Sequence, residues 1–199
     1  MAEIKFFNRW SVEGVKVEDP GLKKYISIEP KVAPKTGARY IGNRFHKAKI
    51  SIVERLINKV MVPGHKAKKH KISSGSISGK SQTAARIVEE ALEIIEKKAN
   101  QNPIGVLVKA IENAAPREEI ISIEYGGARY PKAVESSPLR RVDFVLRLIS
   151  QGAFQKSFNS KKDASVALAD EILAAFNLSA SSASVSKKLE LERQADSAR

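Results

Sequence analysis

Apolar residues recur at intervals of three and four positions along most of the chain after residue 43, a pattern typical of helices with one buried face. This periodicity predicts helices over about 43–61, 81–100, 103–114, 138–152 and 161–177. Pro63-Gly64 ends the first of these and Ser81 can cap the second, while Asn102-Pro103 and Ser137-Pro138 each place a capping residue before a proline. Residues 187–199 are charged with few apolar anchors, which predicts a helix that is frayed or stabilised by a partner.

The stretch after Pro116 has a different period. Ile121, Ile123 and Tyr125 alternate with polar residues, and Gly126-Gly127 separates this run from a second one that extends to about Val134. Two extended runs joined by two glycines predict a β-hairpin over about 119–135 with a two-residue turn. Because Pro131 cannot donate a backbone hydrogen bond, the second strand is expected to be an edge or to be bulged.

The N-terminal region lacks a clear periodicity, and residues 20–43 are rich in proline and glycine. Apolar residues around Phe6, Phe7 and Trp10 indicate either an extended arm that packs on a partner or on the domain, or ordinary core. The predicted fold is mainly α, a bundle of about five or six helices with one protruding β-hairpin and a basic extended N-terminal region. We divide it into an arm and basic loop region (1–43), a helical domain with the hairpin (44–178) and a C-terminal tail that can form a helix (179–199).

Positive charge is concentrated in one part of the chain. The 199 residues carry a formal net charge of +13, and the segment Lys31–Lys80, here called the basic segment, holds 13 lysines and arginines against a single acid, Glu54. Such self-repulsion does not stabilise a fold, whereas neutralising the phosphates of a polyanion releases counterions and supplies affinity. The pattern therefore points to nucleic acid first and to an anionic membrane surface second.

No residues suggest catalysis or a bound cofactor. The run Gly75–Ser81 resembles a phosphate-binding loop, but three residues separate its glycines where the motif needs four, and no apolar strand precedes it. His65 and His70 lie in the same basic loop without a nearby carboxylate, so we expect no metal site and interpret the loop as ordering on RNA. The glutamates of the 81–100 helix suggest a solvated face, with a pair between Glu93 and Lys97.

Aromatic residues interleaved with the cations add stacking to charge. They are Tyr40, Phe45, Tyr125 and Tyr130, although for Phe45, on an amphipathic helix, core is the better interpretation. Long loops suit the irregular surfaces of folded RNA, and no dimerisation heptad is visible. An architectural DNA-binding protein is the alternative, and an enzyme acting on a nucleotide is a third reading without a supporting residue.

Several motifs follow one another in a characteristic order. They are Ile4-Lys5-Phe6-Phe7 to Trp10-Ser11, Ile52–Leu56 with Asn58, Arg86-Ile87-Val88, Asn102-Pro103, 108–113, Pro116-Arg117-Glu118, the Gly126-Gly127 hairpin, Ser137–Val142, and the tail from Lys187 to Arg193. In this combination the chain resembles, over nearly its full length, the archaeal–eukaryotic branch of the small-subunit ribosomal protein seven family. The loop at 64–80 is longer and richer in serine and glycine than the bacterial form, so the family's contacts there do not transfer.

This resemblance implies a structural, non-enzymatic protein in the head of the small ribosomal subunit, and hence a cytoplasmic location without membrane association. It implies binding to the 3′ major domain of small-subunit rRNA and a part in nucleating head assembly. It also implies that the hairpin lies near exit-site tRNA and emerging mRNA. Its protein partners would be other head and platform proteins, including small-subunit protein eleven.

The expected RNA contacts are cations of the basic segment and of the helix after the hairpin: Lys35, Arg39, Arg44, Lys47, Lys49, Lys66, Lys68, Lys69, Lys71, Lys80, Arg140 and Arg141. The planar guanidinium of arginine suits phosphate, although a salt bridge to Asp143 or Glu135 is the alternative for the last two. On the hairpin, the residues expected to face tRNA or mRNA are Tyr125, Arg129, Tyr130 and Lys132.

Overall fold

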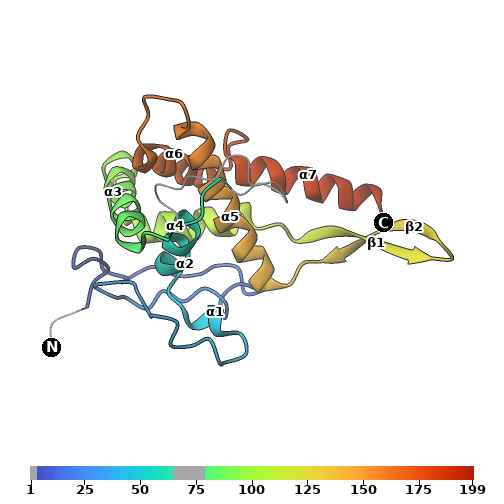
Figure 1. Cartoon of the computed structure of the whole chain (residues 1–199), viewed down its shortest axis with the longest axis horizontal. Coiled ribbons are helices and arrows are strands. Elements are labelled where there is room, and N and C mark those ends of the chain that lie inside the picture. Colours follow the sequence, from blue (N-terminus) through green and yellow to red (C-terminus); the bar gives the residue numbers. More distant parts are fainter. Residues whose placement is uncertain (1–3, 65–78) are drawn as a thin grey trace.

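The computed structural model describes residues 4–64 and 79–199, which form seven helices and one antiparallel two-stranded sheet (Figure 1). The helices are α1 (His46–Lys49), α2 (Ile52–Val60), α3 (Ser81–Ala99), α4 (Pro103–Ala114), α5 (Pro138–Ser157), α6 (Ala164–Phe176) and α7 (Ala183–Ser197), and the strands are β1 (Glu118–Tyr125) and β2 (Ala128–Glu135). The predicted fold class is confirmed, because the helices gather in a bundle and the hairpin extends away from it. The division of the chain at residues 43 and 178 stays an interpretation.

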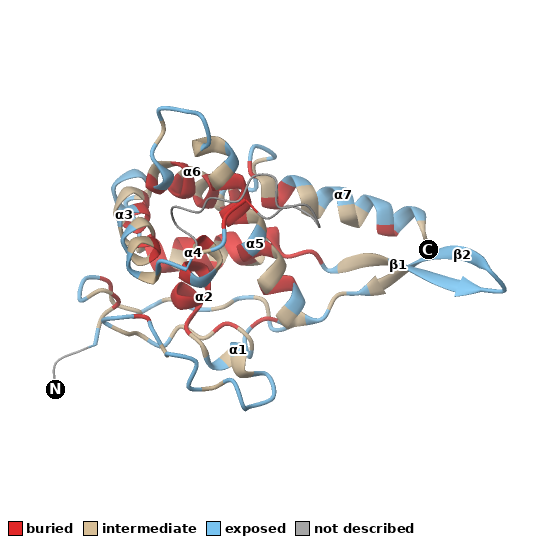
Figure 2. Cartoon of the chain, in the orientation of Figure 1, coloured by how far each residue is buried: buried red, intermediate tan, exposed pale blue. Residues whose placement is uncertain are grey.

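Helix α4 lies at the centre of the bundle. Its start is the predicted one, since the Asn102 side chain accepts a hydrogen bond from the backbone N–H of Ile104 at 3.0 Å and Pro103 takes the first helical position. The helix packs against α3, α5, α6 and α7, and most of its side chains are buried. Figure 2 shows that burial is concentrated in this bundle and that the far end of the hairpin is exposed.

The single helix predicted over 43–61 is wrong in its first half. Only four residues there form α1, and the backbone at Ile50 is extended (φ −83°, ψ 132°) before α2 begins. The break coincides with a contact far away in the sequence, because the N–H of Ile52 donates to the carbonyl of Ser27 at 2.9 Å. This pairing with the N-terminal region overrides the local helical pattern.

Two side-chain expectations near these helices are also wrong. Phe45, interpreted as core, is 54% exposed and has a left-handed backbone (φ 58°) at the residue before α1. Ser81 does not cap α3, because it is the first residue of that helix and Lys80 takes the capping position without a side-chain hydrogen bond.

The N-terminal arm packs on the domain and contributes to its core. Phe6 and Trp10 are buried in the main apolar cluster, and the indole N–H of Trp10 donates to Glu96 Oε2 at 2.9 Å. Arg9 forms an ion pair with Glu93 on the same helix. The expectation of a solvated acidic face on α3 is therefore corrected, because three of its glutamates (Glu89, Glu93 and Glu96) hold the arm, and Glu93 pairs with Arg9, not with Lys97.

The hairpin forms as predicted. Its strands pair one residue to one from Glu118–Glu135 to Tyr125–Ala128, and Gly126 and Gly127 both have positive φ (58° and 81°), as a two-residue turn of this kind requires. Pro131 lies opposite Ser122 in an unbulged strand, and in a two-stranded sheet that strand is an edge.

Helix α7 lies along the base of the hairpin and packs against β1, β2 and α5 (Figure 1). It begins at Ala183, earlier than predicted, and buries Val185 and Ala195. Arg199 donates to both carboxylate oxygens of Glu118, at 2.5 and 2.6 Å. The expectation of a frayed or partner-stabilised terminal helix is corrected, because contacts within the chain hold it.

Candidate nucleic-acid interface

The only acid of the basic segment is turned into the fold. The Glu54 side chain is buried, and its Oε1 accepts hydrogen bonds from the backbone N–H and the hydroxyl of Thr36, both at 2.7 Å. The carboxylate thus ties the preceding loop to α2. Every charge that the described part of this segment presents to solvent is consequently positive.

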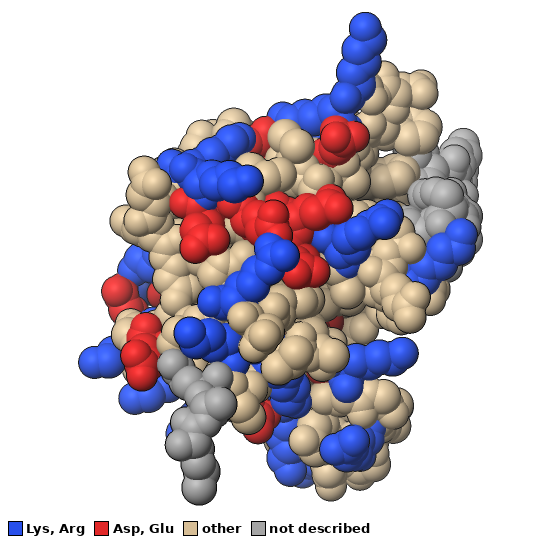
Figure 3. Space-filling model, turned by 90° about the vertical axis from the view of Figure 1, so that its left-hand side faces the viewer, with Lys and Arg blue, Asp and Glu red and all other residues tan. Residues whose placement is uncertain are grey.

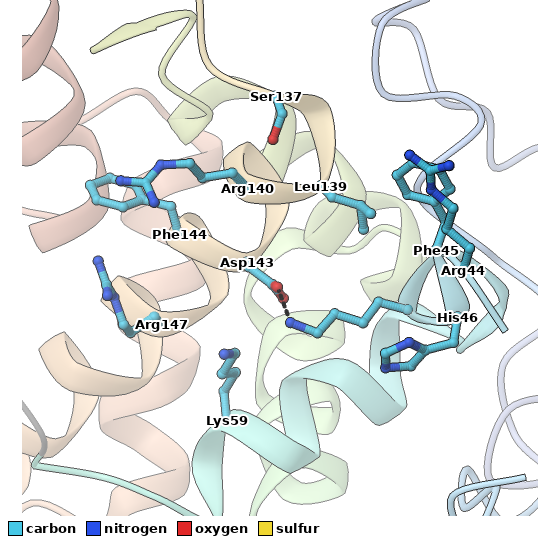
Figure 4. A pocket seen from close by; sticks show the side chains of 11 residues that line it. Arg44, Phe45, His46, Lys59, Ser137, Leu139, Arg140, Asp143, Phe144 and Arg147 are labelled. Atoms are coloured by element: carbon cyan, nitrogen blue, oxygen red, sulfur yellow. Dashed lines mark hydrogen bonds and ion pairs between the residues drawn. The ribbon is translucent and has the colours of Figure 1, made fainter. Parts of the chain in front are cut away.

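A cavity of about 540 Å³ lies between α1, α2 and α5 (Figure 4). We call it the basic cavity because five cations and a single carboxylate line it: Arg44, Lys47, Lys59, Arg140, Arg147 and Asp143. The structure thereby brings three of the predicted RNA contacts together from distant parts of the chain. Phe45, His46, Ser137, Leu139 and Phe144 complete the lining.

Asp143 on α5 is already neutralised by cations from α1 and α2. Its Oδ2 accepts a hydrogen bond from Lys47 Nζ at 2.7 Å, and its Oδ1 pairs with Arg55 Nη2 at 3.2 Å. Burial raises the pKa of Asp143, but the Lys47 hydrogen bond and the charges of Arg55, Lys47 and Lys59 outweigh it and hold the pKa below 3.8. The carboxylate stays ionised, and its charge is shared among these partners.

Three other cations of the cavity have no carboxylate partner in the described part of the chain. Arg44, Lys59 and Arg147 form no ion pair within residues 4–64 and 79–199, although Lys59 lies in the field of Asp143. Burial lowers the pKa of Lys59, and the nearby charges of Lys47, Arg147 and Arg55 lower it further against the attraction of Asp143. An anion entering the cavity would relieve this repulsion.

Each phenylalanine ring of the cavity lies beside an arginine. The guanidinium carbon of Arg44 is 5.2 Å from the ring centroid of Phe45, and that of Arg147 is 5.3 Å from the ring centroid of Phe144. Figure 4 shows the first pair on one side of the hollow and the second on the other, with Lys59 between them. The cavity therefore offers flat apolar surfaces as well as charge.

The two arginines at the start of α5 differ in their placement. Arg140 is exposed and pairs with Glu119 Oε2 at 2.8 Å, a partner that neither alternative anticipated. Arg141 is buried, with hydrogen bonds to the carbonyl of Pro116 at 3.0 Å and to Asp19 Oδ2 at 2.9 Å. The expectation that Arg141 grips phosphate is therefore corrected, because its guanidinium links the N-terminal arm to the hairpin base inside the fold.

The remaining cations of the basic segment are spread along its surface. Lys35 lines a second hollow of about 420 Å³, which shares His46, Lys47, Lys59 and Asp143 with the basic cavity. The exposed side chains outside these hollows are Arg39, Lys49 and Lys80. The predicted contacts Lys66, Lys68, Lys69 and Lys71, together with His65, His70 and most of the glycine-containing run at 75–81, lie outside the described residues.

The hairpin has two chemically different faces. The strand register places Ile121, Ile123, Tyr125, Tyr130 and Lys132 on one face, and the two tyrosines there are 81% and 58% exposed. Arg129 lies on the opposite face beside Glu124, at 3.6 Å. Three of the four predicted hairpin contacts thus share a face, and Arg129 does not.

The end of the molecule that faces away from the hairpin carries charges of both signs. Figure 3 shows this end, where carboxylates gather among lysines and arginines. Helix α3 supplies Glu89 and Glu93, which face Arg9, and Lys98 pairs with Asp170 at 2.7 Å. Such a mixed surface suits a polyanion less well than the basic cavity.

The predicted contacts did not include Lys59, Phe144 and Arg147 of the basic cavity. The spacing held a signal for one of them, since Arg147 is seven residues after Arg140 and shares its helix face. Lys59 and Phe144 could not be found this way, because their meeting depends on how α2 packs against α5.

Comparisons with known proteins agree on one family. The sequence model of the family described as "Ribosomal protein S7p/S5e" matches residues 22–199. The chain is 51% identical to the small ribosomal subunit protein uS7 of Nanoarchaeum equitans, over 99% of this chain and all of that protein. The proteins of the same name from Archaeoglobus fulgidus and Methanosphaera stadtmanae are each 48% identical, over 99% and 98% of this chain and 96% and 98% of theirs.

Within 4–64 and 79–199, no helix is long and apolar enough to span a membrane, and no group of three or more histidine, aspartate or glutamate side chains could hold a metal ion.

Proposed function

The chain belongs to the ribosomal protein S7p/S5e family, and from this premise we propose that it binds the 3′ major domain of small-subunit rRNA and nucleates assembly of the head. The family consists of structural proteins without enzymatic activity, so the chain is a structural component of the small ribosomal subunit and works in the cytoplasmic ribosome. What we propose beyond family membership is the RNA domain that the chain binds and the assembly step that this binding starts.

The observation that carries the proposal is the outward charge of the basic segment. Glu54 is turned inward and Asp143 is already paired, so cations dominate the surface from the loop at Lys35 to the basic cavity. RNA helices that converge on one protein bring several phosphate backbones close together, and such a surface neutralises them. The apolar core behind it supplies a rigid support.

The hairpin has a separate part in this proposal. It reaches away from the bundle (Figure 1), and its exposed Tyr125 and Tyr130 suit stacking or protein contact more than phosphate binding. We place it near exit-site tRNA and mRNA, with small-subunit protein eleven among its neighbours. Removal of the hairpin is therefore expected to leave rRNA binding intact.

A salt titration tests the proposal. The full chain is titrated with the 3′ major domain of small-subunit rRNA and, separately, with duplex DNA of equal length. A protein making about 6–10 phosphate contacts loses roughly 10³–10⁵ in affinity between 50 and 200 mM salt. We expect the rRNA to stay preferred as salt rises; two curves that fall together would favour an architectural DNA-binding protein.

Matched variants locate the contacts. Replacing Lys35 and Lys49 by glutamine should reduce the salt slope by roughly 0.7–0.9 for each lost contact. Replacing the exposed Lys97 and Lys161, which lie outside the basic segment, removes the same charge and should leave the slope nearly unchanged. Equal effects of the two pairs would mean that RNA binding depends only on the net charge of the protein.

A further inference from the structure

We propose that the basic cavity receives one unstacked nucleotide of the bound RNA, with its base against the ring of Phe45 and its phosphate between Lys59 and Arg147. This inference rests on the proposed function and deepens it, because it names the part of the RNA that this site takes. Three features of the site support it: the strained backbone of Phe45, the cations without a carboxylate partner and the size of the cavity.

Phe45 is held outward by a backbone conformation that bulky residues avoid. Its φ of 58° lies in the left-handed region, where a residue with a bulky side chain is a genuine outlier. Phe45 is 54% exposed and lines the cavity. Burial does not account for this strain, and strained residues of this kind concentrate at ligand-binding sites.

The walls of the cavity suit a flat ring with polar edges. On one side Arg44 lies over Phe45, and on the other Arg147 lies over Phe144 (Figure 4). Unstacked RNA bases bind to proteins by stacking on aromatic rings and on guanidinium planes. Both kinds of surface are present here, and they face a common hollow.

The cations left over at this site are those that a phosphate needs. Lys47 is bound to Asp143 and Arg140 to Glu119, whereas Arg44, Lys59 and Arg147 have no carboxylate partner in the part of the chain that the structure describes. Lys59 and Arg147 lie on two helices that pack against each other, α2 and α5, and Figure 4 shows Arg147 near Phe144 and Lys59 between the two pairs of arginine and phenylalanine. A phosphate placed between Lys59 and Arg147 would pair with both.

The shape of the site distinguishes a nucleotide from other anions. A volume of about 540 Å³ falls within the range of roughly 300–1,000 Å³ of small-ligand pockets. An RNA duplex keeps its bases stacked inside and presents only its backbone, so it would leave the two aromatic rings unused. An acidic peptide would use the cations alone and would also leave Phe45 exposed.

The test compares two seven-nucleotide probes of equal charge. One is a fluorescein-labelled heptaadenylate RNA and the other is a heptamer of abasic ribose phosphate with the same label. Binding to the full chain is followed by fluorescence anisotropy at one salt concentration. Because stacking of one base on an aromatic side chain contributes roughly a 5- to 150-fold gain in affinity, we expect heptaadenylate to bind tighter by a factor in this range.

Variants assign that difference to the cavity. Phe45→Leu should remove most of the preference for heptaadenylate and leave the abasic heptamer unchanged. Phe158→Leu is the matched control, because Phe158 is an equally exposed phenylalanine (55% against 54%) outside the cavity, and it should change neither probe. Lys59→Gln should weaken both probes, and Lys97→Gln should weaken both much less.

Three results would overturn the inference: equal binding of the two heptamers, equal effects of Phe45→Leu and Phe158→Leu, or displacement of heptaadenylate by heptaglutamate at the concentration at which heptaadenylate displaces itself. Titration with the 3′ major domain separates this inference from the proposed function. If that RNA is not preferred over duplex DNA, the proposed function fails. If it is preferred while Phe45→Leu leaves the heptamer preference intact, only the nucleotide site fails.

Discussion

Arg55 and Asp143 form an ion pair that joins α2 to α5, with 3.2 Å between Nη2 and Oδ1. The Arg55 side chain is 4% exposed, and its other amino group donates to the carbonyl of Tyr25 at 2.9 Å. An arginine does not lose its proton in a protein, so the buried charge depends on this carboxylate. The pair lies beside the basic cavity, and it also stabilises the packing of α2 against α5.

Asp143→Asn should destabilise the fold, because it keeps the shape of the side chain but leaves Arg55 charged and buried. Breaking a buried pair in this way costs about 3 kcal/mol of the free energy of unfolding, which urea denaturation measures. Glu124→Gln is the control, since it breaks the exposed pair with Arg129 and should cost less than ~1 kcal/mol. Equal losses in the two variants would show that Arg55 finds another partner.

Gly152→Ala should destabilise the protein although it replaces a helical glycine. An added Cβ would lie 2.6 Å from Glu171 Oε1 and 3.0 Å from Ala183 Cβ. Glu171 cannot easily move away, because it is buried and is held by Lys156 at 2.9 Å. We expect a loss of about 1–3 kcal/mol in the free energy of unfolding.

Gly105→Ala provides the matched comparison for that variant. The nearest atom to a Cβ at Gly105 is Val15 Cγ2 at 3.8 Å, an ordinary contact. Here the higher helix propensity of alanine should stabilise α4 by up to ~1 kcal/mol. The same thermal or urea unfolding experiment should therefore give opposite signs for the two substitutions, and a shared sign would contradict the packing account.

Glu96→Ala should loosen the N-terminal arm, because it removes the acceptor of the Trp10 indole hydrogen bond. Trp10 is the only tryptophan of the chain, so acrylamide quenching of its fluorescence reports on the arm directly. We expect easier quenching and a loss of about 1–2 kcal/mol. Glu90→Ala, which removes an exposed carboxylate of the same helix, should leave the fluorescence unchanged.

Stability should fall at acid pH through three aspartates: Asp19, Asp143 and Asp170. Burial raises the pKa of each, but hydrogen bonds and nearby cations outweigh it, so each folded-state pKa lies below 3.8. Between the folded and unfolded pKa values the unfolded chain binds more protons, so their contribution is present above about pH 4 and is lost as pH falls through the lower folded values. Urea midpoints between pH 5 and 2 measure this loss, and Asp143→Asn should make it shallower.

The two faces of the hairpin should act differently. Replacing Tyr125 and Tyr130 by serine removes exposed aromatic surface and should change the protection of exit-site tRNA or neighbouring proteins in reconstituted small subunits. Replacing Glu124 and Arg129 by glutamine alters the opposite face and should change that protection less. Both variants should bind the 3′ major domain and unfold within ~0.5 kcal/mol of the unaltered protein, because these side chains are exposed.

Sequence motifs predicted correctly those elements that are determined by interactions between residues close together in the sequence. Asn102-Pro103 fixed the start of α4 through a hydrogen bond two residues away, and Gly126-Gly127 fixed the hairpin turn through their positive φ angles. The break between α1 and α2 could not be predicted in this way, because it depends on the carbonyl of Ser27, which accepts a hydrogen bond from the N–H of Ile52, 25 positions later in the chain.

The candidate site was predictable in charge but not in geometry. The composition of the basic segment predicted Arg44 and Lys47 as contacts, and both line the basic cavity, whereas the sequence could not show that Arg141 would turn inward to meet Asp19. Nor could it show that Phe45 would turn outward, since an aromatic residue within an apolar pattern ordinarily joins the core. Tertiary packing decided both positions.

The way the N-terminal arm crosses the domain has a consequence for the order of folding. Its hydrogen bonds connect Trp10 to Glu96 and Asp19 to Arg141, pairs separated by 86 and 122 residues. Such contacts close long loops, so they slow the search for the native state, and they cannot form before α3 and α5 exist. The arm is therefore expected to dock last and, in amide hydrogen exchange, to open before the central helices do.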